Sequence, residues 1–111
     1  MANKIKALYI KPRKNPILME IEDDLNSLQD LVGGNIEMYT PFDDYEVAII
    51  CNEEGKINGL TPNRAIFSSK GKLLDFIAGN FLIVYAKEDK DSFSSLPQDM
   101  IDKYTKIFAI R

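Results

Sequence analysis

Residues 47–51, Val-Ala-Ile-Ile-Cys, are apolar at every position. A strand that is apolar on both faces is typical of the inside of a sheet, where other elements cover both sides. Residues 81–86, Phe-Leu-Ile-Val-Tyr-Ala, repeat this pattern and predict a second buried strand. We therefore expect the fold to be built around these two strands.

Weaker strand signals lie on either side of the two apolar runs. Segments rich in β-favouring residues and bounded by turn residues predict strands at residues 4–11, 17–22, 35–39, 65–67 and 73–77. The links between them are short, which favours a mainly antiparallel sheet over a doubly wound one. We expect an α+β fold with about five to seven short strands, in a single domain that spans residues 1–111.

Two helices are predicted, one after the second strand and one at the C-terminus. The first begins at an N-cap, Asp23 or Asp24, and ends at Gly33-Gly34, because glycine adopts the left-handed conformation without penalty. The second is expected to begin with a capping box, because Gln98 follows Ser95 at a spacing of three residues. Its apolar stripe, expected to pack on the sheet, consists of Met100, Ile101, Tyr104, Ile107 and Phe108.

The composition excludes several kinds of chemistry. The chain has no histidine, so histidine-activated nucleophiles and histidine-ligated metals are excluded. Its one cysteine, Cys51, ends an apolar run, and we favour a buried thiol over a reactive one. No phosphate-binding loop that ends in Gly-Lys-Ser/Thr is present. We expect a non-enzymatic protein without a metal site or a cofactor.

The sequence also bears on location. No apolar run approaches the roughly 20 residues of a membrane-spanning helix. The start of the chain, Met1-Ala2-Asn3-Lys4, lacks the apolar core of a signal peptide. We therefore expect a cytoplasmic protein that does not bind membranes.

Charge is segregated along the chain. Residues 1–14 contain five bases and no acid, whereas residues 15–55 contain eleven acids and no base. The acidic stretch could form one negative patch for a basic partner, or it could be a set of solvated and neutralised charges, which we favour. The net charge of −3 and the shortness of the basic segment argue against direct binding of nucleic acid.

The favoured interpretation makes a specific structural prediction. If residues 4–11 and 17–22 form a hairpin, Lys4 and Lys6 face Glu20 and Glu22. Opposite charges at facing positions of two strands stabilise the pair modestly.

Segment 52–64 is the strongest candidate for a binding site, because loops on a rigid sheet often hold binding groups. It begins with a predicted tight turn in which Gly55 takes a positive φ. Arg64 could clamp a carboxylate or phosphate, or it could form an ion pair with Asp75 or Glu54, which we favour. The candidate ligand-binding residues are Asn52, Glu53, Asn58, Asn63 and Arg64.

Four segments share a recognisable pattern: residues 31–37 (Leu-Val-Gly-Gly-Asn-Ile-Glu), 52–60 (Asn-Glu-Glu-Gly-Lys-Ile-Asn-Gly-Leu), 62–65 (Pro-Asn-Arg-Ala) and 77–84 (Ile-Ala-Gly-Asn-Phe-Leu-Ile-Val). Together they resemble a family of short bacterial proteins known only as a domain of unknown function. Members of that family occur in gut-associated Gram-positive bacteria, often on phages, plasmids and conjugative elements. The resemblance implies an accessory role and supplies no activity and no site residues.

Three functions fit these patterns. The leading hypothesis is a non-enzymatic accessory protein of mobile-element or phage origin that binds another, unidentified protein. The alternatives are an acidic nucleic-acid mimic that blocks a defence or DNA-processing protein, and a small-ligand-binding domain centred on segment 52–64. The oligomeric state is open, because Tyr39, Phe42 and Tyr45 could form an interface or fold onto the core.

Overall fold

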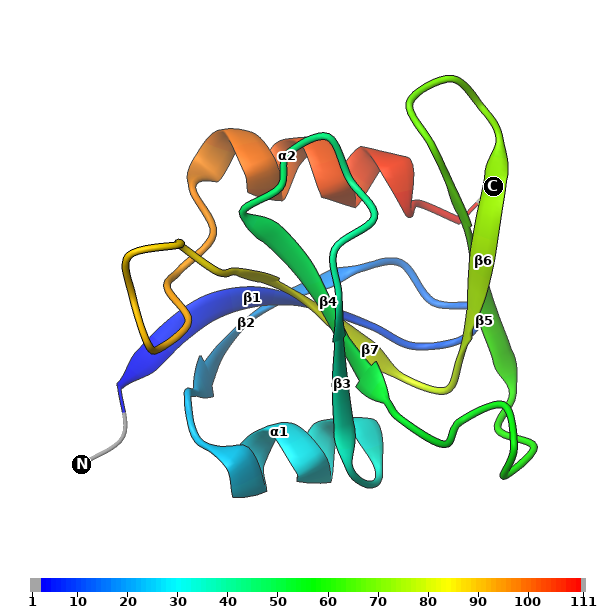
Figure 1. Ribbon diagram of the computed structural model, residues 1–111, viewed down its shortest axis with the longest axis horizontal. Coiled ribbons are helices and arrows are strands. Elements are labelled where there is room, and N and C mark those ends of the chain that lie inside the picture. The colour runs from blue at the N-terminus through cyan, green and yellow to red at the C-terminus, as the bar shows by residue number, and fades with distance from the viewer. Residues whose placement is uncertain (1–2, 111) are drawn as a thin grey trace.

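A computed structural model describes residues 3–110 of the chain (Figure 1). Residues 1, 2 and 111 lie outside the described part, and with them the ends of the predicted 1–111 domain and part of the N-terminal segment used to predict location. Five strands form an antiparallel sheet in the order β2 (Ile17–Glu22), β1 (Lys4–Ile10), β7 (Phe81–Tyr85), β4 (Val47–Asn52) and β3 (Ile36–Tyr39).

The remaining elements are a hairpin and two helices. β5 (Pro62–Phe67) and β6 (Leu73–Ala78) form a separate two-stranded antiparallel sheet. α1 (Leu25–Val32) follows β2, and α2 (Gln98–Ile107) lies near the C-terminus. The predicted α+β fold, with its mainly antiparallel sheet and two helices, is confirmed.

The two apolar runs lie next to each other in the five-stranded sheet and are covered on both faces. Along β4, Val47, Ile49 and Cys51 belong to one buried cluster, and Ala48 and Ile50 belong to another. α2 covers the first face and α1 the second, and the two helices lie on opposite sides of the sheet (Figure 1). This double cover explains why β4 lacks the alternation of a strand with one solvated face. No helix within residues 3–110 is long and apolar enough to cross a membrane.

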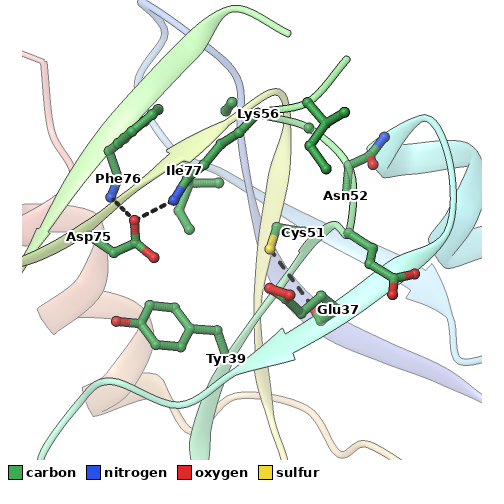
Figure 2. A pocket seen from close by; sticks show the side chains of 12 residues that line it. Glu37, Tyr39, Cys51, Asn52, Lys56, Asp75, Phe76 and Ile77 are labelled. Carbon is green, nitrogen blue, oxygen red and sulfur yellow. Dashed lines mark hydrogen bonds and ion pairs between the residues drawn. The ribbon is translucent and has the colours of Figure 1, made fainter. Parts of the chain in front are cut away.

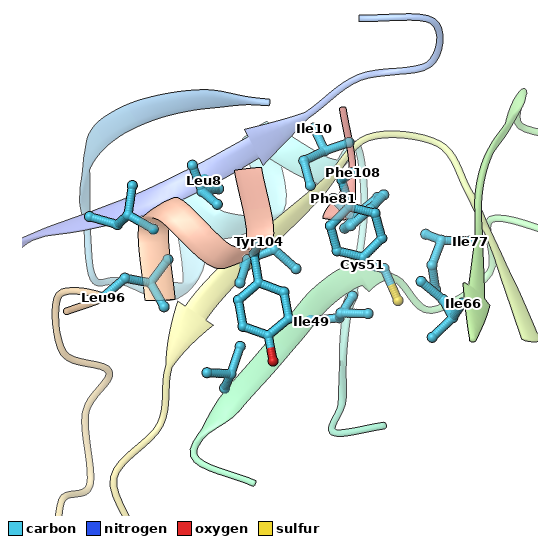
Figure 3. Packing of buried hydrophobic residues seen from close by; sticks show 13 residues of the cluster. Leu8, Ile10, Ile49, Cys51, Ile66, Ile77, Phe81, Leu96, Tyr104 and Phe108 are labelled. Carbon is cyan, nitrogen blue, oxygen red and sulfur yellow. The ribbon is translucent and has the colours of Figure 1, made fainter. Parts of the chain in front are cut away.

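The β5–β6 hairpin completes the cover of the α2 face. Ile66 and Ile77 extend from the hairpin toward Cys51 and Phe81 in the buried cluster (Figure 3). The other large apolar side chains of the hairpin are exposed to solvent: Phe67, Leu73, Leu74 and Phe76. Because a two-stranded hairpin is only marginally stable alone in water, its position depends on its contacts with the rest of the molecule.

The helix termini are partly as predicted. The Asp24 side chain caps α1 by accepting a hydrogen bond from the backbone N–H of Ser27 at 2.7 Å, and Gly33 ends the helix at φ 82°. The capping-box prediction for α2 is wrong, because the N-cap is Pro97, which makes no side-chain hydrogen bond. Ser95 Oγ instead accepts a hydrogen bond from the backbone N–H of Lys6 at 2.7 Å and so fixes the approach to α2 against β1.

The register of the β1–β2 hairpin is the predicted one. Lys4 pairs with Glu22, and Lys6 pairs with Glu20. The base-rich start of the chain is therefore placed directly against the first acids of the acidic stretch, as the favoured interpretation of the charges requires.

The structure corrects two details of residues 52–67. β5 begins at Pro62 rather than at residue 65, and Pro62 pairs with Ala78 at the end of the hairpin, where a missing N–H is tolerated. The prediction of a positive φ at Gly55 is wrong, and in this turn it is Gly59 that has one, at 69°. Gly55 instead permits close packing, because a Cβ there would lie 2.7 Å from the carbonyl oxygen of Ala78.

Candidate functional site

Arg64 joins three separate segments of the chain. Its Nε and Nη2 donate to the carbonyl oxygen of Phe108 at 3.1 and 2.9 Å, and Nη2 also donates to the carbonyl oxygen of Lys14 at 2.6 Å. Its Nη1 donates to Asn63 Oδ1 at 2.8 Å. The guanidinium therefore ties β5 both to the residue that ends α2 and to the turn between β1 and β2.

Asn63 extends this network to the sheet. Its Nδ2 donates to the carbonyl oxygens of Ile10 at 3.0 Å and Gly79 at 2.8 Å. Both polar atoms of Asn63 are thus engaged within the chain, and the donors of Arg64 bind backbone carbonyl oxygens and Asn63 Oδ1. The structure gives these two predicted ligand-binding residues a positioning role for the hairpin, and we call Asn63 and Arg64 the hairpin staple.

The other candidates lie around a different feature, a pocket of about 250 Å³ between β6 and the β3–β4 pair (Figure 2). Asn52 and Glu53 line this pocket, whereas Arg64 does not. Asn52 is buried, donates from Nδ2 to the carbonyl oxygen of Val32 at 3.3 Å and accepts at Oδ1 from the backbone N–H of Glu54 at 2.8 Å. The structure therefore divides the predicted site residues between two places: Asn63 and Arg64 contact each other in the hairpin staple, and Asn52 and Glu53 line the pocket.

Lys56 and Asp75 form an ion pair at this pocket. The Lys56 ammonium also lies 4.5 Å from the ring centroid of Phe76. The predicted ion pair of Arg64 with Asp75 or Glu54 is wrong, because Lys56 is the partner of Asp75 and Arg64 binds carbonyl oxygens. Both members of the Lys56 pair are partly exposed, so the pair adds little to stability. The last candidate, Asn58, is exposed in the turn before β5.

Cys51 lines the same pocket and is buried, as predicted. Its Sγ donates to the carbonyl oxygen of Glu37 at 3.8 Å. Burial, reinforced by the negative charges of Glu37 and Asp75, raises the pKa of the Cys51 thiol to about 11. The thiol is therefore protonated at neutral pH and is a poor nucleophile.

The raised pKa of Cys51 predicts a loss of stability in alkali. The unfolded thiol ionises near pH 9 and the folded thiol near pH 11, so the unfolded chain binds fewer protons between these values. The stabilisation is complete below about pH 9 and is lost as the pH rises toward 11. In urea titrations over this range, the wild-type free energy of unfolding should fall by roughly 1 to 2 kcal/mol more than that of Cys51→Ala. Parallel curves for the two proteins would contradict the burial of this thiol.

A larger and more apolar groove lies between the C-terminal half of α2, β5 and residues 41–43; its volume is about 430 Å³. Phe42 and the buried Tyr104 pack together at its inner side, with ring centroids 4.7 Å apart. Phe67 from β5 and Ile107 from α2 also line it, and they are 54% and 53% exposed. We call this feature the α2–β5 groove.

The sequence did not indicate this groove. Ile107 was predicted to pack on the sheet with the rest of the α2 stripe; Ile101, Tyr104 and Phe108 do so, but the prediction is wrong for Ile107. One residue could have indicated the groove. Phe67 is a large aromatic residue directly before the Ser68–Gly71 turn, and a side chain so close to a turn has little access to the hydrophobic core. The groove arises from three segments that are far apart in sequence.

The wall formed by residues 41–44 is fixed to α2. Asp44 accepts hydrogen bonds from Lys103 Nζ and, at 2.8 Å, from the Tyr104 hydroxyl. The Lys103 contact lowers the pKa of Asp44, and burial together with the Asp44 charge raises the pKa of Tyr104. Of the aromatic residues whose role was open, Tyr39 and Phe42 pack against the core, whereas Tyr45 is exposed.

The acids of residues 15–55 are spread over several elements. Glu20 and Glu22 face bases across β1–β2, Asp24 caps α1, and Asp44 is held against α2. Glu53 lies in the turn after β4. Several of these charges are therefore engaged locally.

Comparison with known families identifies the chain's relatives. A family model described as "Domain of unknown function (DUF3846)" matches residues 5–109. The chain belongs to this family. The resemblance to a domain of unknown function, inferred from four motifs, is thereby confirmed. No match was found among curated proteins or solved structures.

Proposed function

We propose that this DUF3846 protein is a non-enzymatic accessory protein that binds another protein through the α2–β5 groove. The observation that carries the proposal is the pair of half-exposed apolar side chains, Phe67 and Ile107, at a groove of about 430 Å³. Contiguous exposed apolar surface next to a concavity is typical of a protein-interaction site. A phage or mobile-element origin is part of the proposal and rests on the family resemblance in the sequence.

Each wall of the groove is also held in place by contacts with the rest of the molecule. Tyr104 and Phe108 anchor α2 in the core, the hairpin staple holds β5 to the end of α2, and Asp44 fixes the third wall. A preformed groove binds with a smaller loss of conformational entropy than a flexible surface does. This arrangement suits recognition of a short segment of another protein.

The non-enzymatic part of the proposal is supported by the state of the polar groups. Asn52, Asn63 and Arg64 are engaged in hydrogen bonds that position the backbone. The pKa values of Cys51 and Tyr104 are raised, which keeps both groups protonated rather than activated. These are the features of a scaffold that presents a surface.

Mutation of the groove provides the direct test. We expect Ile107→Asp to reduce recovery of a specific partner at least about tenfold when the tagged protein is used for affinity capture from cells of its source organism, because a carboxylate at an apolar contact costs more than about 1.4 kcal/mol. Phe67→Asp should have the same effect. The measurement is quantitative mass spectrometry of the captured proteins, after thermal unfolding has shown that the variants are folded.

Leu25→Asp is the matched control. Leu25 is an exposed apolar residue of similar accessibility on α1, on the opposite face of the sheet. The partner should be retained by this variant. A partner lost with Leu25→Asp but kept with Ile107→Asp, or no partner that depends on either residue, would contradict the proposed binding surface.

A further inference from the structure

We infer that the segment which binds in the α2–β5 groove is acidic: a stretch of the partner that combines carboxylates with large apolar side chains. This inference rests on the proposed function and adds the chemistry of the partner. It comes from a basic surface around the groove that is not visible as a single run in the sequence.

Three segments of the chain contain bases and no acids. They are residues 12–16, 62–72 and 103–110. Together they contain seven bases: Arg13, Lys14, Arg64, Lys70, Lys72, Lys103 and Lys106. In a chain with a net charge of −3, this is a strong local departure from the average.

The fold brings these segments together at the groove. Residues 62–72 form β5 and most of the hairpin turn, and residues 103–110 include the C-terminal half of α2; both line the groove. Residues 12–16 join them through the hydrogen bond from Arg64 Nη2 to the Lys14 carbonyl oxygen and through that from the backbone N–H of Ile110 to Asn15 Oδ1 at 2.8 Å. The tip of the hairpin rises beside the C-terminal end of α2 (Figure 1).

Most of this positive charge is not neutralised within the chain. Among residues 3–110, Lys103 has an ion-pair partner in Asp44, whereas the other six bases form no ion pair. Arg64 is bound by neutral carbonyl and amide oxygens, so its charge is solvated by the protein without being cancelled. Of the described side chains that line the groove, Asp43 alone carries a carboxylate. Of the seven bases, Arg64 and Lys103 line the groove, and the other five belong to the segments that line or adjoin it. The surplus of positive charge therefore belongs to these surrounding segments, next to exposed apolar side chains.

An acidic amphipathic segment complements both features. Its apolar side chains would enter the groove against Phe67 and Ile107, and its carboxylates would meet the surrounding bases; such complementarity raises specificity and the rate of association. A nucleic acid would use the charges but not the apolar groove, and it would be repelled by the acids on the rest of a net negative molecule. The combination therefore favours a protein segment.

Three synthetic peptides provide the probe. All carry the same leucine and phenylalanine residues at helical spacing, and the positions between them are glutamate, glutamine or lysine. Each is titrated into the ¹⁵N-labelled full chain, and backbone amide shifts are followed by NMR. We expect the glutamate peptide to shift the amides of Phe67 and Ile107, to bind at least about fivefold more tightly than the glutamine peptide, and to lose this advantage at high salt.

Charge variants make the test specific. Lys106→Glu, a change next to Ile107 on α2, should weaken the glutamate peptide about fivefold and leave the glutamine peptide unaffected. Lys87→Glu makes the same charge change in the exposed loop after β7 and should have no effect. A single-stranded oligonucleotide and the unliganded chain at high concentration are run in parallel.

Each outcome has a distinct meaning. Equal binding of the glutamate and glutamine peptides at the groove would overturn the acidic partner and leave the proposed function intact. Tighter binding of the oligonucleotide at the same amides, or self-association that covers Phe67, would overturn the class of partner. If none of the peptides shifts the groove amides, the proposed function itself fails.

Discussion

Replacing Arg64 by alanine is expected to lower the free energy of unfolding by about 2 to 4 kcal/mol, because hydrogen bonds from a charged donor contribute about 1.5 to 3 kcal/mol each and are not fully additive. The guanidinium is the common donor to the carbonyl oxygens of Phe108 and Lys14 and to Asn63 Oδ1. Urea unfolding at constant pH measures the loss. Amide hydrogen exchange should show it most strongly in β5 and β6, which have little stability of their own.

Two further variants serve as controls for Arg64→Ala. Arg64→Lys keeps the charge but loses the planar fork, so it should recover less than half of the loss. Lys72→Ala removes an exposed base from the same hairpin and should change stability by less than about 0.5 kcal/mol. If Arg64→Ala matched Lys72→Ala, the guanidinium would not be holding the hairpin, and the groove would have to be kept open by packing alone.

The hairpin staple could not be predicted from the sequence, whereas several other features could. The two central strands, the α1 boundaries and the Lys–Glu register of β1–β2 follow from local patterns, because apolar runs, caps and alternation act over a few residues. The sequence predicts a binding site in segment 52–64. In the structure, Asn63 and Arg64 of this segment instead hold the β5–β6 hairpin in position. Their side chains bind backbone carbonyls contributed by residues 10, 79 and 108, and a sequence does not reveal such distant partners.

The α2–β5 groove could not be predicted for the same physical reason. Its walls come from residues near positions 42, 67 and 107, which meet only after the hairpin has packed on the sheet. Helical periodicity places Ile107 on the apolar stripe of α2, but the residues that pack into the core are Ile101, Tyr104 and Phe108. Ile107 lies at the edge of this stripe and is left half exposed. Apolar periodicity predicts which side of a helix is buried, not how wide the buried part of that side is.

The basic surface follows the same principle. In sequence, Arg13 and Lys14 belong to the basic start of the chain, which is expected to neutralise part of the acidic stretch, and Lys4 and Lys6 do face acids in this way. The turn after β1 carries the remaining bases past the β1–β2 pair to Arg64 and the end of α2. One short basic segment thus contributes both to neutralisation within the chain and to a positive surface at the groove.

Replacing Phe81 by alanine is expected to have the largest effect on stability, a loss of about 3 to 5 kcal/mol, because removal of a fully buried ring leaves a cavity as well as losing apolar burial. Phe81 is fully buried in β7, and its ring lies 5.7 Å from that of Phe108 in an edge-to-face arrangement. Phe108 in turn offers the carbonyl oxygen that holds Arg64. The cavity should therefore loosen the end of α2 and the hairpin together, and both should lose protection from hydrogen exchange.

Phe67→Ala is the control for this prediction, since it removes the same side chain from a half-exposed position on the hairpin. We expect it to change the free energy of unfolding by less than about 1 kcal/mol while weakening binding at the groove. Phe81→Leu, which keeps most of the volume, should cost no more than about 1.5 kcal/mol and serves if Phe81→Ala does not fold. Equal losses for Phe81→Ala and Phe67→Ala would mean that the hairpin face is part of the core. In that case Phe67 would not be available to a partner, and the binding surface would have to lie elsewhere.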